Sequence, residues 1–171
     1  LFGEQGNDSL SGGDGTDYLY GGEGNDTFVF NRGDGHDSVY SYDESYDADL
    51  AQHFYGVGQD VIQLGVDIAP SDLTFRQYGD NLTIAINGTT DSLIVYGYFS
   101  TNAFWQIDEI RFTDGSGTVM RLADVNAVLL STTPTDGDDH LVGNEFGELI
   151  DGRAGNDLIE GLEGNDNLQG S

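Results

Sequence analysis

Apolar residues recur at every ninth position near the start of the chain, each two positions after an acidic residue. The apolar residues are Leu10, Leu19 and Phe28. The acids are Asp8, Asp17 and Asp26. A glycine lies two positions before each acid, at Gly6, Gly15 and Gly24. Three coupled positions that keep one period predict repeated structural units rather than a flexible linker.

The same period returns near the other end of the chain. Its acids are Asp139, Glu148, Asp157 and Asp166. Its apolar residues are Leu141, Ile150, Ile159 and Leu168. One further unit, residues 32–40, continues the first stretch after a two-residue insertion at Phe30 and Asn31. The chain therefore carries eight repeat units in two blocks.

Each unit combines a six-residue turn with a three-residue strand. The turn, of the form G-G-x-G-x-D, uses glycine for backbone conformations that other residues resist. The strand, x-U-x, directs its apolar side chain U inward. Two units complete one coil, and coils stack at about 4.8 Å, the spacing of neighbouring strands. The pattern predicts a parallel β-roll in which each acid lies beside the acid two units along.

Residues 41–133 lose this period and predict another kind of β structure. Alternating apolar and polar residues predict strands at residues 61–64, 73–77, 82–87, 93–96 and 107–112. Turn residues separate these runs, notably at 78–81 and at Asn87-Gly88, so we expect antiparallel hairpins. Apolar residues at 122, 125, 128 and 129 predict a short helix over 122–130. Because an open roll end exposes unpaired strand edges, this segment is expected to act as a cap.

These elements predict an all-β protein, with parallel β-roll blocks at both ends flanking an antiparallel β segment with one short helix. The expected parts are a first roll block at 1–40, a capping or linker segment at 41–133 and a second, truncated roll block at 134–171. Because the chain starts and stops inside repeats, we expect it to be a fragment of something longer. No apolar run approaches the roughly 20 residues of a membrane span.

The charge balance indicates that a cation is missing. Asp and Glu number 31 against five Arg and no Lys, for a formal net charge of −26. Such a field repels phosphate backbones and anionic lipid, which argues against nucleic-acid and membrane-surface partners. The absence of Cys excludes disulfides and thiolate metal sites. Stacked carboxylates favour Ca²⁺, which takes six to eight oxygen ligands in irregular geometry, whereas Mg²⁺ demands a tighter octahedron.

The units resemble the G-G-x-G-x-D-x-U-x repeat of RTX (haemolysin-type) calcium-binding proteins. The resemblance covers residues 3–40 and 134–170, and the middle resembles the non-repeat segment that often separates RTX blocks. It implies a parallel β-roll with Ca²⁺ between turns two units apart. One turn would give the backbone oxygens of its second and fourth positions and its sixth-position carboxylate. The next turn on that edge would give the oxygens of positions one, three and five, with its own acid nearby.

Carried over by position, the resemblance implies four complete sites, and about four to six Ca²⁺ ions when incomplete sites are counted. On one edge of the first block, Glu4, Gly6 and Asp8 would face Gly21, Glu23, Asn25 and Asp26. On the opposite edge, Gly13, Gly15 and Asp17 would face Arg32, Asp34, His36 and Asp37. Gly22, Gly24 and Asp26 would look toward a site completed around Asp43 and Glu44.

The second block would hold the other two complete sites. Thr135, Gly137 and Asp139 would face Gly152, Ala154, Asn156 and Asp157. Asn144, Phe146 and Glu148 would face Gly161, Glu163, Asn165 and Asp166. Phe146 stands where the repeat has glycine and Glu148 where it has Asp, so we expect this site to be the weaker of the two.

The sequence shows no catalytic motif, and we do not expect an enzyme. His36, His53 and His140 are scattered, and the first and last are expected to be solvent-facing turn residues. Asp91 falls in a turn outside the repeats and is expected to be an exposed acid. The aromatic residues Tyr96, Tyr98, Phe99, Phe104 and Trp105 could form a sugar-stacking platform, although packing in a core or cap is favoured.

Two functions follow as expectations. The resemblance implies a module that leaves a bacterial cell by type I secretion and folds on extracellular Ca²⁺. It would be a folding or stabilising scaffold of a larger toxin, enzyme or adhesin, secreted or on the cell surface. Its partners would be calcium ions and the rest of the parent polypeptide. The alternative is a carbohydrate-binding or adhesive module that uses the aromatic middle segment.

Overall fold

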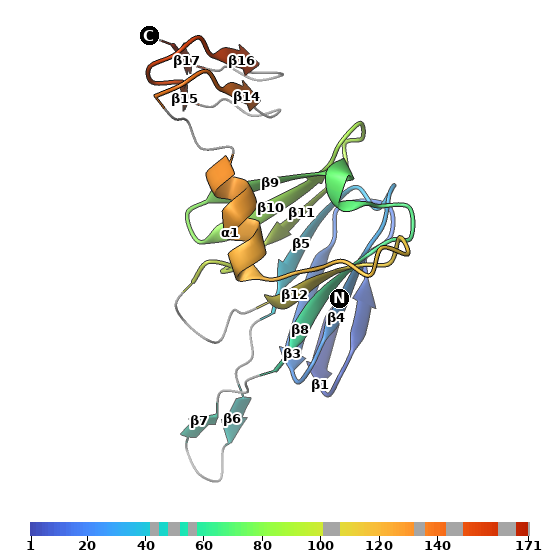
Figure 1. Cartoon of the computed structure of the whole chain (residues 1–171). Helices are drawn as coiled ribbons and strands as arrows, with labels where there is room; N and C mark the ends of the chain where they lie inside the picture. Colours follow the sequence, from blue (N-terminus) through green and yellow to red (C-terminus); the bar gives the residue numbers. More distant parts are fainter. Residues whose placement is uncertain are drawn as a thin grey trace. The chain divides into compact units, whose positions relative to one another are not determined.

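The computed structural model describes residues 1–41, 45–47, 52–54, 58–100, 107–131, 136–142, 149–160 and 167–170 (Figure 1). The chain divides into two compact units, Leu1–Asn126 and Ala127–Ser171. Strands dominate the described residues, and the predicted helix is present as α1 (Leu122–Ser131). The all-β fold class is confirmed. Within the described ranges, no helix has the length and apolar character needed to cross a membrane.

A six-stranded sheet of the first unit begins with three strands of the first repeat block (Figure 1). Its order is β1 (Phe2–Gln5), β3 (Tyr18–Glu23), β5 (His36–Tyr40), β11 (Ser92–Val95), β10 (Asn81–Ile86) and β9 (Leu73–Tyr78). Phe2 of β1 pairs in parallel with Tyr20 of β3, two repeat units along. Tyr18 of β3 pairs with Ser38 of β5, an offset lengthened by the insertion in the repeat. The predicted coil length and the two-residue insertion are both confirmed.

A five-stranded sheet holds the alternate strands of the same coils. Its order is β2 (Ser9–Ser11), β4 (Thr27–Phe30), β8 (Asp60–Leu64), β12 (Ile107–Phe112) and β13 (Val119–Met120). The inward residues of the first block, Leu10, Leu19, Phe28 and Val39, are all buried. Residues of the middle segment are buried with them, including Ile62, Leu82, Ile84 and Ile110. The apolar position of the repeat therefore builds part of the core of this unit.

Three strands of the middle segment continue the roll. β8 pairs in parallel with β4, β12 with β8, and β11 with β5. Our antiparallel prediction is wrong for these pairs, because the alternation of apolar and polar residues is the same in both kinds of strand. Antiparallel pairing among the described strands joins β11, β10 and β9, joins β12 to β13, and joins β6 (Ser45–Asp47) to β7 (Gln52–Phe54). The predicted boundary at residue 40 lies inside one compact unit.

The second unit repeats the coil geometry of the first block. β14 (His140–Val142) pairs in parallel with β16 (Leu158–Glu160), with Leu141 opposite Ile159. β15 (Leu149–Asp151) pairs in parallel with β17 (Asn167–Gln169), with Ile150 opposite Leu168. In both pairs the partners are two repeat units apart, as the period predicts.

Four aromatic rings stack across the six-stranded sheet. The ring centroids of Phe2, Tyr20, Tyr40 and Tyr96 follow one another at 4.7, 4.7 and 4.4 Å, and successive rings are within 11° of parallel. These residues lie on the outer face of the sheet, because their strand neighbours Leu19 and Val39 point into the core. The spacing matches the distance between neighbouring strands, so the ladder supports the stacking of the coils.

Candidate metal centre

The described repeat turns share a left-handed backbone at their second and fourth positions. At the second position, φ is 73° at Glu4, 75° at Gly13, 94° at Gly22, 89° at Gly33 and 64° at Arg153. At the fourth position, φ is 127° at Gly6, 135° at Gly15, 125° at Gly24, 84° at Gly35 and 137° at Gly155. Glycine adopts these angles without strain, whereas Glu4 and Arg153 do so at an energetic cost.

The turns on one edge stack so closely that several glycines leave no room for a side chain. A Cβ on Gly22 would collide with the carbonyl oxygen of Glu4, and one on Gly24 with that of Gly6. On the opposite edge, a Cβ on Gly35 would collide with the carbonyl oxygen of Gly15. The carbonyls of the second and fourth positions therefore face the next turn on their edge.

The acids form columns held together by the backbone. The N–H of Asp8 donates to Oδ1 of Asp26 at 2.9 Å, and the N–H of Asp17 donates to Oδ1 of Asp37 at 3.0 Å. In the second unit, the N–H of Asp139 donates to Oδ1 of Asp157 at 3.0 Å. Each bond brings two carboxylates of successive coils to the same edge of a roll.

The second oxygen of these carboxylates is the feature that points to a cation. Oδ2 of Asp8, of Asp37 and of Asp157 is buried and has no hydrogen-bond partner among the described residues. A buried acceptor without a partner is costly, and an ionised one is more so. Burial raises the pKa of Asp37 to about 6, and the nearby charges of Asp17 and Asp34 add to the rise although the N–H of Asp17 opposes it.

Side chains at the fifth position of the turns form a second ladder. The N–H of Asn25 donates to Oδ1 of Asn7 at 2.9 Å, and the N–H of Gln59 donates to Oδ1 of Asn25 at 2.7 Å. In the second unit, the N–H of Asn156 donates to Oδ1 of Asp138 at 2.9 Å. Asn or Asp at this position therefore holds the next turn of the same edge in register, a role that we did not predict from the sequence.

The donor set fits Ca²⁺. Within the described ranges, no three or more His, Cys, Asp or Glu side chains gather as a metal-binding cluster. The stacked turns instead offer carboxylates in pairs beside backbone carbonyls, and all of these donors are oxygen. A hard cation that tolerates many oxygen ligands in irregular geometry suits such turns, and that cation is Ca²⁺.

Comparison with known proteins identifies calcium-binding repeats at both ends of the chain. Residues 1–28 and 134–168 match the family model of the RTX calcium-binding nonapeptide repeat. The chain contains RTX calcium-binding repeats. Residues 81–121, between the two RTX blocks, match the model of the haemolysin-type calcium binding protein related domain. Both matched models describe calcium-binding repeat proteins or their relatives, in agreement with the resemblance seen in the sequence.

An iron-regulated protein of Neisseria meningitidis serogroup C, FrpA, is similar to this chain. The two are 37% identical over 133 residues, which is 76% of this chain and 11% of that relative. The chain thus spans about a tenth of the length of the relative it matches.

The structure brings together the two halves of both RTX sites predicted in the first block. Between turns 3–8 and 21–26, Glu4 lies opposite Gly22, and the N–H of Gly6 donates to the carbonyl of Glu23 at 2.7 Å. Between turns 12–17 and 32–37, the N–H of Gly15 donates to the carbonyl of Asp34 at 3.0 Å. His36 is exposed, as expected, and its Nδ1 lies 2.9 Å from Oγ of Ser92.

One predicted RTX site of the second block is described in part, and the other is not. A Cβ on Gly155 would collide with the carbonyl oxygen of Gly137. In the same pair of turns, the N–H of Asp139 donates to Oδ1 of Asp157. Gly152, Ala154 and Asn156 belong to the same turn as Asp157. The remaining predicted ligands of this block lie outside the described residues: Thr135, Asn144, Phe146, Glu148, Gly161, Glu163, Asn165 and Asp166.

The acid column that contains Asp26 extends beyond the RTX motif. The N–H of Asp26 donates to Oδ1 of Asp60 at 2.8 Å, and the N–H of Asp60 donates to Oδ2 of Asp108 at 3.0 Å. We predicted Asp43 and Glu44 as the continuation; both lie outside the described residues, and the acid aligned with Asp26 is Asp60. The missed signal is the string G-Q-D-V-I-Q at 58–63, which keeps the last glycine, the acid and the apolar residue of a repeat.

The expectation that Asp91 is an exposed acid is wrong. Asp91 is 6% exposed, and its two carboxylate oxygens accept the backbone N–H groups of Gly33 and Gly35. No local sequence pattern predicts the burial of Asp91, because both hydrogen-bond partners are far from it along the chain.

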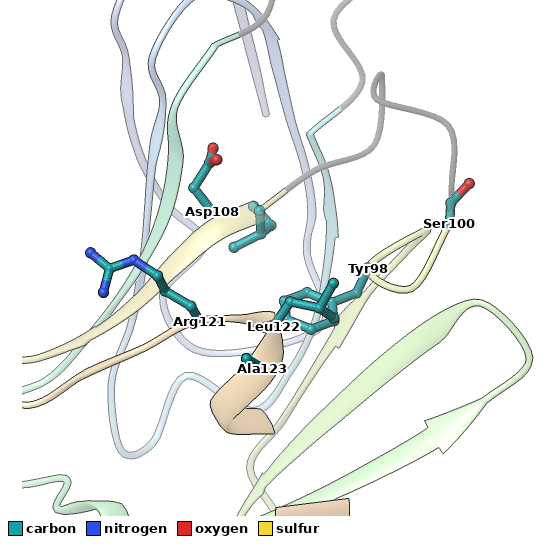
Figure 2. Close-up of a pocket in the computed structure, with 7 residues that line it drawn as sticks. Tyr98, Ser100, Asp108, Arg121, Leu122 and Ala123 are labelled. Atoms are coloured by element: carbon teal, nitrogen blue, oxygen red, sulfur yellow. The ribbon is translucent and has the colours of Figure 1, made fainter. Parts of the chain in front are cut away.

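Three of the aromatic residues considered as a sugar platform are described, and they do not form one surface. Tyr96 belongs to the ring ladder, whereas Tyr98 is 4% exposed and meets Phe99 edge-on at 5.0 Å. Tyr98 lines a cavity of about 200 Å³, where the polar ends of Asp108 and Arg121 point away from its ring (Figure 2). Phe104 and Trp105 lie outside the described residues. The described part of the cluster therefore packs as core and ladder.

Proposed function

We propose that this chain is a calcium-dependent folding module of a larger exported protein. The observation that carries the proposal is the set of buried carboxylate oxygens at Asp8, Asp37 and Asp157, which have no hydrogen-bond partner among the described residues. Bound Ca²⁺ supplies positive charge between turns whose acids otherwise repel one another. Because the turns of an unfolded chain form no such site, the free energy of metal binding becomes free energy of folding.

The proposed ligands follow the stacked turns. On one edge of the first block, the carbonyls of Glu4 and Gly6 and the carboxylate of Asp8 bind together with the turn that ends at Asp26. On the other edge, the carbonyls of Gly13 and Gly15 and the carboxylate of Asp17 bind together with the turn that ends at Asp37. Extracellular calcium modules have dissociation constants of about 10⁻⁴ to 10⁻³ M. Such sites are empty in a cytosol and filled outside the cell.

Export and a scaffold role are part of the proposal. The chain matches only 11% of a much longer relative, as expected of one module among several. The absence of Cys suits a polypeptide that crosses a secretion channel unfolded, since it cannot crosslink before folding. We place the module outside the cell or on its surface after type I secretion, with the rest of the parent polypeptide as its partner.

The test is a calcium titration of the full chain followed by far-ultraviolet circular dichroism. Starting from chelated protein, we expect a cooperative gain of β structure with Ca²⁺. Mg²⁺ at the same concentrations should not reproduce it, because it keeps its water ligands and needs a regular octahedron. A spectrum that chelator and Ca²⁺ leave unchanged would overturn the proposal.

A further inference from the structure

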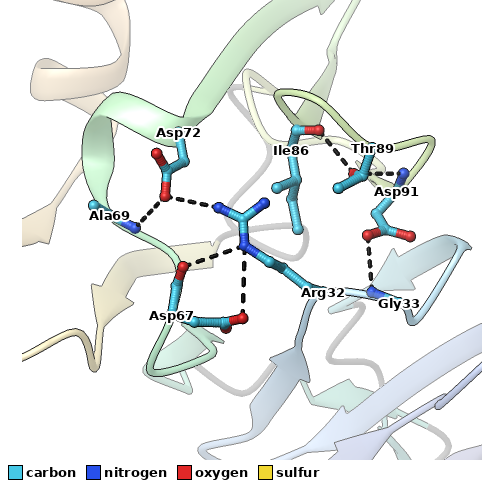
Figure 3. Close-up of polar contacts among 8 residues, drawn as sticks. All are labelled: Arg32, Gly33, Asp67, Ala69, Asp72, Ile86, Thr89 and Asp91. Carbon is cyan, nitrogen blue, oxygen red and sulfur yellow. Dashed lines mark hydrogen bonds and ion pairs between the residues drawn. The ribbon is translucent and has the colours of Figure 1, made fainter.

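Asp91 holds a repeat turn from outside the repeats. Its Oδ2 accepts the N–H of Gly33 at 2.8 Å (Figure 3). Its Oδ1 accepts the N–H of Gly35 at 3.1 Å. Its own backbone N–H donates to Oγ1 of Thr89 at 3.1 Å, and the Thr89 hydroxyl donates to the carbonyl of Ile86. Asp91 is therefore fixed at the start of β11 while both its oxygens engage turn 32–37.

Because the peptide bond is planar, these two hydrogen bonds also fix the directions of two carbonyl groups. The N–H of Gly33 belongs to the same peptide unit as the carbonyl of Arg32, and the N–H of Gly35 to the same unit as the carbonyl of Asp34. In a trans peptide, the N–H and C=O groups point in opposite directions. Because Asp91 holds the N–H groups, the carbonyls of Arg32 and Asp34 point away from it. The carbonyl of Asp34 accepts the N–H of Gly15 at 3.0 Å.

The side of the turn that faces β11 is closed by protein groups. The carbonyl of Gly35 accepts the N–H of Ser92 at 2.8 Å. The guanidinium of Arg32 donates to Oδ2 of Asp72 at 2.8 Å and to the carbonyl of Asp67 at 3.2 Å (Figure 3). The turn is thus anchored by residues of the middle segment on one side. On the other side, its Asp34 carbonyl and Asp37 carboxylate accept the N–H groups of Gly15 and Asp17.

We propose that Asp91 is a positioning residue for the calcium site between turns 12–17 and 32–37, which it serves by aiming the carbonyls of Arg32 and Asp34. The inference rests on the proposed calcium binding and assigns part of that site to a residue outside both repeat blocks. In a repeat array, the next calcium-bound turn would order these peptide units. Here a carboxylate of the chain does so without metal, and the acid column of this edge needs no turn after Asp37.

The test is a residue-resolved Ca²⁺ titration of the full chain by ¹⁵N nuclear magnetic resonance. The variant is Asp91→Asn, which keeps one acceptor oxygen, and the matched control is Asp80→Asn, which removes the same charge from an exposed turn. We expect the half-saturating Ca²⁺ concentration reported by the amides of Gly13 and Gly15 to rise about tenfold in Asp91→Asn, equivalent to about 1.4 kcal/mol. The amides of Gly6 and Gly24, on the other edge, should move much less.

The outcomes separate the inference from its alternatives. If the half-saturating Ca²⁺ concentration rises equally on both edges, Asp91→Asn destabilises the chain generally, and the proposed role of Asp91 is overturned. The role is also overturned if Asp91→Asn and Asp80→Asn give the same half-saturating concentrations at all four amides. If Asp91→Asn does not fold even in excess Ca²⁺, Asp91→Glu, which keeps the charge and displaces both oxygens by one methylene, must give the selective shift. If the wild-type chain shows no saturable change on either edge, the proposed calcium binding fails. If the wild-type chain binds Ca²⁺ but the Asp91 variants affect both edges alike, calcium binding stands and only the role of Asp91 fails.

Discussion

The backbone N–H of Asp17 donates to Oδ1 of Asp37 at 3.0 Å, although the two carboxylates repel each other. The bond keeps the turns of successive coils in register. Burial raises the pKa of Asp37 to about 6, and the charges of Asp17 and Asp34 contribute to the rise. The same contact that orders the roll therefore concentrates negative charge in it, and this conflict can be relieved by metal or by protons.

Mild acid should partly replace calcium in folding the first unit. The pKa of Asp37 is higher in the fold than the usual value of 3.8, so the folded state binds the proton more tightly than the unfolded state does. In calcium-free protein, the β signal in circular dichroism should therefore rise as the pH falls from 7 to 5. Asp37→Asn should show a smaller dependence on pH over this interval, with Asp80→Asn as the control. A β signal that falls on acidification would show that another group dominates.

Asp17→Ala should weaken calcium-dependent folding far more than Asp80→Ala. Removing one of two carboxylates from a largely dehydrated cation site should cost about 2–4 kcal/mol, by analogy with breaking a buried charged pair. Asp80 lies in an exposed turn, where a substitution usually changes stability by about 0.5 kcal/mol or less. The measurement is the Ca²⁺ midpoint of the folding transition. Equal midpoints for the two variants would remove Asp17 from the site.

The sequence was sufficient to predict those features of the roll that repeat locally. The recurrence of Asp8, Asp26 and Leu10 in one period predicted strand spacing, burial and a register of two units, because each depends on residues within one unit. The insertion at Phe30 and Asn31, visible in the sequence, lengthens the step between β3 and β5 in the structure. A complete motif specifies its own geometry and that of its neighbour.

The continuation of the roll could not be predicted in the same way. Residues 60–64 form β8 beside β4, but their alternation of side chains fits parallel and antiparallel partners equally. The burial of Asp91 depends on N–H groups of Gly33 and Gly35, which only the folded chain brings near it. Pairing direction and long-range capping depend on which edges and donors remain open, and no short window of sequence contains that information.

The ring ladder should contribute measurable stability at Tyr40. Tyr40 stacks between Tyr20 and Tyr96, and burial together with hydrogen bonding to Tyr96 raises its pKa to about 12. Tyr40→Ser should lower the free energy of unfolding of the calcium-bound chain by about 1–3 kcal/mol, from lost apolar burial and ring contacts. Tyr18→Ser is the matched control, because Tyr18 is 52% exposed in the same sheet. Equal losses in urea unfolding would indicate that the stacked rings add nothing beyond an exposed tyrosine.

Gly22 and Gly33 provide a matched test of how closely the turns stack. Both occupy the second position of a turn, with φ of 94° and 89°. A Cβ on Gly22 would collide with the carbonyl oxygen of Glu4, whereas a Cβ on Gly33 would meet no atom within 4 Å. Alanine at either position carries the strain of a left-handed backbone, about 1–2 kcal/mol.

Gly22→Ala should add to this strain a steric effect that Gly33→Ala lacks. The atom in conflict is a backbone carbonyl oxygen and a proposed calcium ligand, so relieving the collision moves the ligand or separates the coils. We therefore expect Gly33→Ala to fold with a modestly raised Ca²⁺ midpoint. Gly22→Ala should need at least about tenfold more Ca²⁺, equivalent to about 1.4 kcal/mol beyond the shared strain. Calcium titrations of the two variants by circular dichroism compare them directly, and coinciding midpoints would mean that backbone strain alone accounts for glycine at this position of the repeat.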